Sequence, residues 1–130
     1  MNNLPFIAVV DDDPIYRLTI QKLLESTGVV GKILEFENGY PILRYLQDHL
    51  NDLPDIILLD INMPGMGGWD FLNAYEKILS TLSKRPKIYI VSSSSNDQDI
   101  AKAKTYTCVT NYITKPIKKD NLIKQLNLII

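Results

Sequence analysis

The sequence predicts one doubly wound α/β domain, and three observations support this fold class. Five short apolar segments alternate with amphipathic helical patterns along the whole chain. Most of these segments are nearly continuous runs of Ile, Leu and Val, which is typical of parallel strands buried on both faces of a sheet. The length of 130 residues and the net charge of -1 match one ordinary globular domain, which we assign to residues 1–130.

The five apolar segments have the length of strands and are bounded by turn residues. The second segment differs from the others because it contains Glu35 and is followed by Glu37. We therefore expect it at an edge of the sheet, where charge is tolerated. The predicted strands are residues 6–10, 33–36, 56–59, 88–91 and 112–114.

The helical patterns lie between these strands and after the last one. The first helix has Asp13 as its expected N-cap, Pro14 at its first position and Gly28 as its stop. The fourth pattern has only a thin apolar face, and the last is marked by apolar residues that follow Lys118 and Lys119. The other expected helices are residues 41–50, 69–82 and 97–104, and a final one carrying Leu122, Ile123, Leu126 and Ile129.

Composition excludes several classes of protein. With one cysteine, Cys108, and one histidine, His49, the chain forms no internal disulfide and no Cys/His metal site. A pI near 5.7 and scattered lysines provide no basic stripe, so we expect no direct nucleic-acid binding. The N-terminus has neither a signal core nor a membrane span, and we expect a cytoplasmic protein with no membrane contact.

Polar residues follow the predicted strands at their carboxyl ends. Asp11, Asp12 and Asp13 follow the first strand, Asp60 the third, Ser92 the fourth and Lys115 the fifth. In a parallel sheet these ends share one edge, which is where ligands bind. Asp13 taken alone is better explained as a helix cap.

If the first and third strands are neighbours, Asp12 and Asp60 converge at this edge. Two carboxylates about 5 Å apart repel by roughly 3 kcal/mol at an effective dielectric of 20, so a cation is needed. Carboxylate oxygens with room for water suit Mg²⁺, and Lys115 supplies a second positive charge. An ionised Asp60 in such a site can attack phosphorus and form an acyl phosphate.

Four motifs in order resemble one known family across nearly the whole chain. They are Val9-Val10-Asp11-Asp12, Asp60-Ile61-Asn62-Met63-Pro64 with Gly68 eight residues beyond Asp60, Val91-Ser92-Ser93, and Tyr112-Ile113-Thr114-Lys115-Pro116. The sequence resembles the response-regulator receiver domains of two-component signalling. The resemblance implies a flavodoxin-like (βα)₅ fold with strand order 2-1-3-4-5.

The resemblance also implies a role for each matching residue. Asp60 is the expected phosphoacceptor. Mg²⁺ is expected to be bound by Asp60, by Asp12 directly, by Asp11 largely through water and by the main-chain carbonyl of Asn62. Ser92, Ser93 and Lys115 are expected to bind the phosphoryl group, and Ser92 and Tyr112 to form a switch. The Lys115–Pro116 peptide bond is expected to be cis.

One departure from the family pattern concerns the end of the fourth helix. Cys108 and Val109 stand where members of the family usually carry Gly-Ala. A glycine cap is therefore not expected there, and partner recognition can differ.

We predict a stand-alone response regulator that is not an enzyme in the usual sense. A sensor histidine kinase or phosphotransfer protein is the expected phosphodonor, through its phosphohistidine. The output is expected to pass to an unknown protein through the fourth helix, fifth strand and fifth helix, because the sequence ends at Ile130. Ile100, Tyr106 and Ile123 are lesser candidates on that face.

Two alternatives remain open. A small Mg²⁺-dependent phosphatase or phosphotransferase would use Asp60 as nucleophile, but Asn62 occupies the position where an acid/base aspartate would stand. A degenerate receiver would serve as a constitutive binding module. It is disfavoured because the site residues are all present, namely Asp11, Asp12, Asp60, Ser92 and Lys115.

Overall fold

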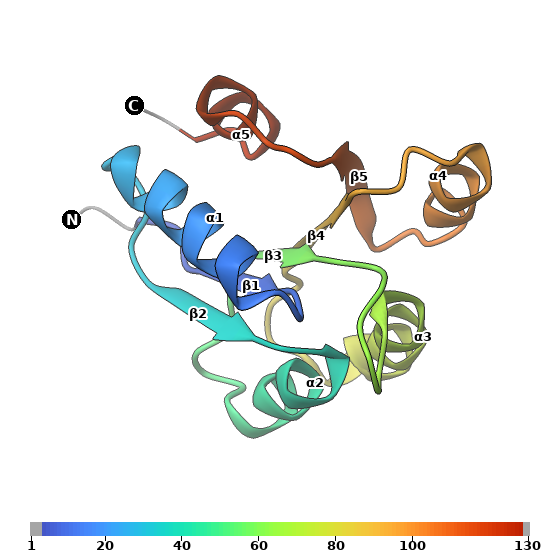
Figure 1. The fold of residues 1–130 in the computed structure, drawn as a ribbon. Helices are drawn as coiled ribbons and strands as arrows, with labels where there is room; N and C mark the ends of the chain where they lie inside the picture. Colours follow the sequence, from blue (N-terminus) through green and yellow to red (C-terminus); the bar gives the residue numbers. More distant parts are fainter. Residues whose placement is uncertain (1–3, 129–130) are drawn as a thin grey trace.

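The computed structural model of the protein describes residues 4–128 and contains one parallel sheet with helices on both faces. The five strands lie in the order β2-β1-β3-β4-β5 (Figure 1). This confirms the α/β class, the strand order and the edge position of the second strand. The strands are β1 (Ile7–Val10), β2 (Ile33–Phe36), β3 (Ile56–Leu59), β4 (Lys87–Ser92) and β5 (Val109–Thr114). The helices are α1 (Pro14–Ser26), α2 (Gly39–Asp48), α3 (Gly68–Ile78) with the 3₁₀ turn η1 (Leu79–Thr81), α4 (Asp97–Ala103) and α5 (Lys119–Gln125).

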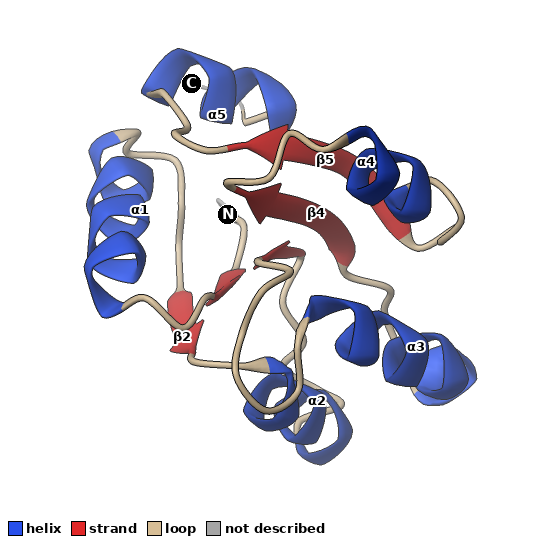
Figure 2. Ribbon diagram, turned by 45° about the vertical axis from the view of Figure 1, so that its right-hand side comes forward, coloured by secondary structure: helices blue, strands red, loops and turns tan. Residues whose placement is uncertain are grey.

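Each face of the sheet carries its own hydrophobic core. Figures 1 and 2 show α1 and α5 on one side of the sheet and α2, α3 and α4 on the other. Along β1, Ile7 and Val9 belong to the core under α1 and α5, whereas Ala8 and Val10 belong to the core under α2 and α3. This alternation follows from the two-residue period of a strand and requires apolar residues at every position.

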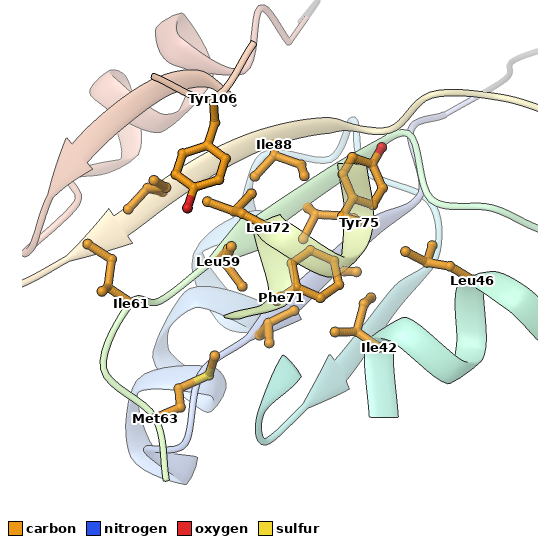
Figure 3. Packing of buried hydrophobic residues seen from close by; sticks show 14 of the residues in the cluster. Ile42, Leu46, Leu59, Ile61, Met63, Phe71, Leu72, Tyr75, Ile88 and Tyr106 are labelled. Atoms are coloured by element: carbon orange, nitrogen blue, oxygen red, sulfur yellow. The ribbon is translucent and has the colours of Figure 1, made fainter. Parts of the chain in front are cut away.

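The core on the α2 and α3 side contains the larger side chains (Figure 3). Phe71 and Tyr75 of α3 are fully buried, and the Tyr75 hydroxyl donates a hydrogen bond to the carbonyl of Pro86. Tyr106 also lies in this core, where its ring stacks on Trp69 with centroids 5.8 Å apart. Tyr106 therefore packs toward α3 and is buried, so its prediction as a candidate on the exposed face of α4, β5 and α5 is wrong.

The first helix has the predicted boundaries. The Asp13 side chain accepts a hydrogen bond from the Ile15 amide at 2.9 Å, as an N-cap does. Gly28 follows the helix with a φ of +72°, a conformation that glycine adopts without strain.

Two other helices begin and end elsewhere than predicted. The second helix starts at Gly39, before Pro41, because the side chain of Asn38 accepts from the Tyr40 amide and caps it. It ends at Asp48, so Leu50 lies beyond it. The third starts at Gly68 and ends at Ile78, where the chain tightens into the 3₁₀ turn η1.

The last strand is longer than predicted, and the C-terminal helix is shorter. β5 begins at Val109 because β4 pairs with its polar first half, which the apolar pattern does not reveal. The first and fourth strands differ from prediction by one residue at their ends. α5 ends at Gln125, and Ile129 lies outside the described residues.

No helix between residues 4 and 128 is long and apolar enough to cross a membrane.

Candidate functional site

The acidic residues predicted to converge do so at the carboxyl edge of the sheet. β1 and β3 pair with Val10 opposite Leu59, so the residues that follow these two strands meet. The Asp60 amide donates to the Val10 carbonyl at 2.9 Å and fixes this register at the edge. One carboxylate oxygen from each of Asp11, Asp12 and Asp60 lies within 4.8 Å of the others. Asp11 and Asp60 are buried and Asp12 is exposed.

Lys115 brings a positive charge into this acidic cluster from the end of β5. Its Nζ atom lies 2.7 Å from Oδ2 of Asp11 and 3.8 Å from Oδ2 of Asp60. The Lys115 amide donates to the Ser92 carbonyl at 2.8 Å, which extends the β4–β5 pairing to this point. The Lys115–Pro116 peptide bond is cis.

Burial and neighbouring charge perturb Asp60. Burial, together with the charges of Asp11 and Asp12, raises the pKa of the Asp60 carboxyl to about 6, and Lys115 and the Ile61 amide oppose this shift. The Ile61 amide donates to Oδ1 of Asp60 at 2.9 Å. Because this pKa lies below 7, the ionised form of Asp60 still predominates at neutral pH.

This perturbed carboxyl predicts how stability depends on pH in the metal-free protein. A folded-state pKa of about 6, above the ordinary 3.8, means that the folded protein binds the Asp60 proton more tightly than the unfolded chain does. Stability is therefore lost as pH rises from about 4 to about 6. We expect Asp60→Asn to be more stable than the wild type at pH 7 by about 2 kcal/mol, with the difference disappearing near pH 4.

Urea unfolding of both proteins across this pH range, with a chelator present, checks the expectation. Parallel stability curves for the two proteins would contradict it.

The donor set fits a hard divalent cation. Three carboxylates face one ammonium group, so the cluster keeps an excess of negative charge, which adds to the effect of burial in raising the pKa of Asp60. Oxygen ligands of this kind, one of them exposed to water, suit Mg²⁺. Asn62 lies in the exposed loop after β3, two residues beyond Asp60.

Ser92 and Tyr112 are joined through the loop that follows β4. The fully buried Ser92 hydroxyl oxygen accepts from the Ser94 amide at 3.1 Å. The Tyr112 hydroxyl donates to the Ser94 carbonyl at 2.7 Å, so the tyrosine contacts this loop rather than the acidic cluster. Ser93 is exposed.

Two residues that matter to the site, Arg17 and Tyr16, were missed in the sequence, and Gly68 was noted there only as part of the Asp60 motif. The Arg17 guanidinium donates to the Asp11 carbonyl at 2.6 Å and to Glu35 at 3.1 Å, which ties the loop after β1 to α1 and β2. The ring of Tyr16 lies against Lys115, with Nζ 4.0 Å from the ring centroid. Gly68 packs directly on the backbone of Asp60. The available signal was the position of Tyr16 and Arg17 in the first turn of the helix that opens beside Asp11 and Asp12.

Comparison with known proteins gives consistent matches. A sequence profile of the response regulator receiver domain matches residues 7–127. The chain is 30% identical to the protein PilH of Pseudomonas aeruginosa, over 95% of this chain and 96% of PilH. It is 31% identical to the nitrate/nitrite response regulator protein NarL of Escherichia coli, over 93% of this chain but only 52% of NarL, so it spans about half of that relative.

Solved structures agree with these sequence matches. A two-component response regulator from Cytophaga hutchinsonii superposes with a TM-score of 0.85 at 27% identity, covering 93% of this chain and 92% of that one.

Proposed function

The chain belongs to the response regulator receiver domain family, and we propose from this premise that Asp60 accepts a phosphoryl group from a phosphohistidine of a partner protein. The observation that carries the proposal is the meeting of three carboxylates and one ammonium group at the carboxyl edge of the sheet. Asp60 is one of the two buried carboxylates, and its Oδ2 atom lies 3.8 Å from the Nζ atom of Lys115.

In the proposed transfer, an ionised oxygen of Asp60 attacks phosphorus and forms the acyl phosphate bond. The phosphorus–nitrogen bond of the donor breaks, and the leaving imidazole keeps its electron pair and takes up a proton. Asp60 is a competent nucleophile at neutral pH because its pKa of about 6 leaves it mostly ionised. Phosphoryl transfer asks little more of a protein than positioning and charge neutralisation.

Lys115 and the two aspartates Asp11 and Asp12 provide the charge neutralisation and the metal ligands that this transfer needs. The Lys115 ammonium lies close enough to Asp60 to pair with an oxygen of the incoming group. Asp11, Asp12 and the main-chain carbonyl of Asn62 would hold Mg²⁺ together with Asp60. When bound, the ion neutralises the transferring oxygens and so permits an anionic group to approach an acidic pocket. Ser93 would border the phosphoryl-binding position beside Ser92.

The signal would leave the site through the loop after β4. A phosphoryl oxygen that accepts a hydrogen bond from the Ser92 hydroxyl would draw this Oγ atom toward Asp60 and away from the Ser94 amide, which donates to it in the structure. Movement of Ser94 would then release or redirect Tyr112, whose hydroxyl is bound to the Ser94 carbonyl. The surface of α4, β5 and α5 would change with it and present a different face to a downstream protein.

The chain is further proposed to act as a single-domain regulator whose output is another protein. The likeness to PilH, which covers nearly the full length of both chains, supports this proposal. The donor would be a sensor histidine kinase or a phosphotransfer protein.

Incubation with acetyl phosphate and Mg²⁺ tests the proposal. We expect intact-mass measurement to show one added phosphoryl group, and no addition when a chelator removes the metal. Asp12→Ala should retain the fold, because it deletes one of several crowded like charges, and should need more Mg²⁺ for the same labelling.

Two other outcomes would favour the alternatives. Repeated turnover of phosphate esters would indicate a phosphatase, and failure of the wild type to label would indicate a constitutive binding module.

A further inference from the structure

The aromatic face of Tyr16 covers the Lys115 ammonium group. Tyr16 lies in the first turn of α1, whereas Lys115 follows β5, so the fold joins two distant parts of the chain here. The ammonium nitrogen lies 4.0 Å from the ring centroid, which is well within the range of a cation–π contact. We propose that Tyr16 is a positioning residue whose ring holds the Lys115 ammonium over the acidic cluster. This inference rests on the proposed transfer to Asp60.

Lys115 needs positioning because hydrogen bonding alone fixes it incompletely. A lysine side chain is a flexible four-carbon stem with three equivalent donors. In the structure the hydrogen bond to Asp11 at 2.7 Å fixes one donor, whereas Asp60 at 3.8 Å is beyond hydrogen-bond length. The ring of Tyr16 supplies a second contact and leaves the lysine side chain only 17% exposed.

A ring face suits a lysine that has to change partners. To pair with a phosphoryl group on Asp60, the ammonium must shift from its position on Asp11 so that one of its other donors reaches a phosphoryl oxygen. A second carboxylate in place of the ring would compete with that oxygen and would add negative charge to an already acidic site. The ring attracts the cation through its quadrupole and can do so both before and after the transfer.

The ring, rather than the hydroxyl, is the part of Tyr16 that the argument requires. Burial, together with the nearby charges of Asp11 and Asp60, raises the pKa of Tyr16 to about 12. The phenol is therefore neutral at physiological pH and adds no charge to the cluster. Phenylalanine should be able to replace tyrosine, whereas an aliphatic residue should not.

Tyr16 also packs against the core under α1 and α5, so a purely structural role is the competing explanation. A similar lysine–ring contact at the amino ends of the strands serves as a control that distinguishes the positioning role from a purely structural one. There Lys32 lies 4.6 Å from the ring centroid of Phe6, which precedes β1 and is remote from the acidic cluster. Phe6→Leu removes a ring that contacts a lysine and loosens the core without touching the site.

The first measurement is the initial rate of labelling by acetyl phosphate with Mg²⁺, for variants shown by thermal unfolding to be folded at the assay temperature. We expect Tyr16→Leu to slow labelling about fivefold, the effect of losing one cation–π contact. Tyr16→Phe and Phe6→Leu should label at rates close to that of the wild type. Equal rates for Tyr16→Leu and the wild type, or an equal loss in Phe6→Leu, would overturn the proposal.

The second measurement is the NMR signal of the Lys115 side chain, assigned by its loss in Lys115→Met. Protons above a ring face are shifted upfield, so we expect an upfield Lys115 CεH₂ signal in the wild type and in Tyr16→Phe but not in Tyr16→Leu. An unshifted signal in the wild type would overturn the proposal, whatever the labelling rates. A shifted signal in a wild-type protein that takes up no phosphoryl group would overturn the proposed function, and the positioning role with it.

Discussion

The Asp60→Asn variant is expected to take up no phosphoryl group under conditions that label the wild type completely. An amide has no anionic oxygen with which to attack phosphorus, and no other carboxylate has the same surroundings. Asp11 is occupied by hydrogen bonds from Lys115 and from the Asp13 amide, and Asp12 is exposed. The variant should be folded, because asparagine has nearly the same shape and removes a charge that burial and the neighbouring Asp11 both disfavour, as the raised pKa of Asp60 indicates. Intact-mass measurement after incubation with acetyl phosphate and Mg²⁺ gives the result.

Asp13→Asn is the matched control for this loss. It makes the same chemical change at an aspartate beside the site, and the asparagine oxygen can still cap α1 through the Ile15 amide. We expect this variant to label like the wild type. Equal labelling of Asp60→Asn and the wild type would show that the phosphoryl group goes elsewhere.

The fold could be predicted from the sequence because burial leaves a pattern in it. The runs at residues 7–10 and 56–59 are apolar at every position, as required of strands between two cores, and Glu35 marks the edge strand β2. The start of β5 left no such pattern, because Thr110 and Asn111 are exposed on an edge strand. This part of the strand is held by the pairing of Val109 and Asn111 with β4. The start of α2 depends on the N-cap formed by Asn38. The sequence did not reveal this cap, because Pro41 suggested that the helix begins two residues later.

The charged part of the site could also be predicted, because chain topology alone brings strand ends together. The acidic convergence needed only that β1 and β3 be parallel neighbours. The roles of Tyr16 and Arg17 depended on how the first turn of α1 lies over the carboxyl edge. The orientation of a helix on a sheet is set by packing, and hydrophobic periodicity does not encode it.

Gly68 is the glycine at which an added methyl group should lower the stability of the fold most. Its amide donates to the Ile61 carbonyl at 2.8 Å, and this bond holds the start of α3 against the end of β3. A Cβ atom added there would lie 2.5 Å from the Asp60 carbonyl oxygen and 2.8 Å from the Ile61 Cα atom. Both atoms belong to the backbone, so neither can rotate away. A glycine in this place permits the close approach of helix and strand that sets the position of Asp60.

Gly68→Ala is therefore expected to lower the free energy of unfolding by roughly 3 kcal/mol or more, because overpacking against backbone forces the two segments apart. Helix propensity alone predicts that Gly68→Ala raises the free energy of unfolding, since alanine is more favourable than glycine in a helix by about 1 kcal/mol.

Gly67→Ala provides the control, because its nearest contact would be the Ile61 carbonyl oxygen at 3.1 Å. It should cost less than about 1 kcal/mol. Urea unfolding of the three proteins measures both effects. A Gly68→Ala protein as stable as the wild type would mean that α3 does not pack on the backbone of Asp60 as closely as the structure has it. If the two segments do separate, labelling of Asp60 should also slow in Gly68→Ala and stay unchanged in Gly67→Ala, because only the former displaces the backbone that carries the phosphoacceptor.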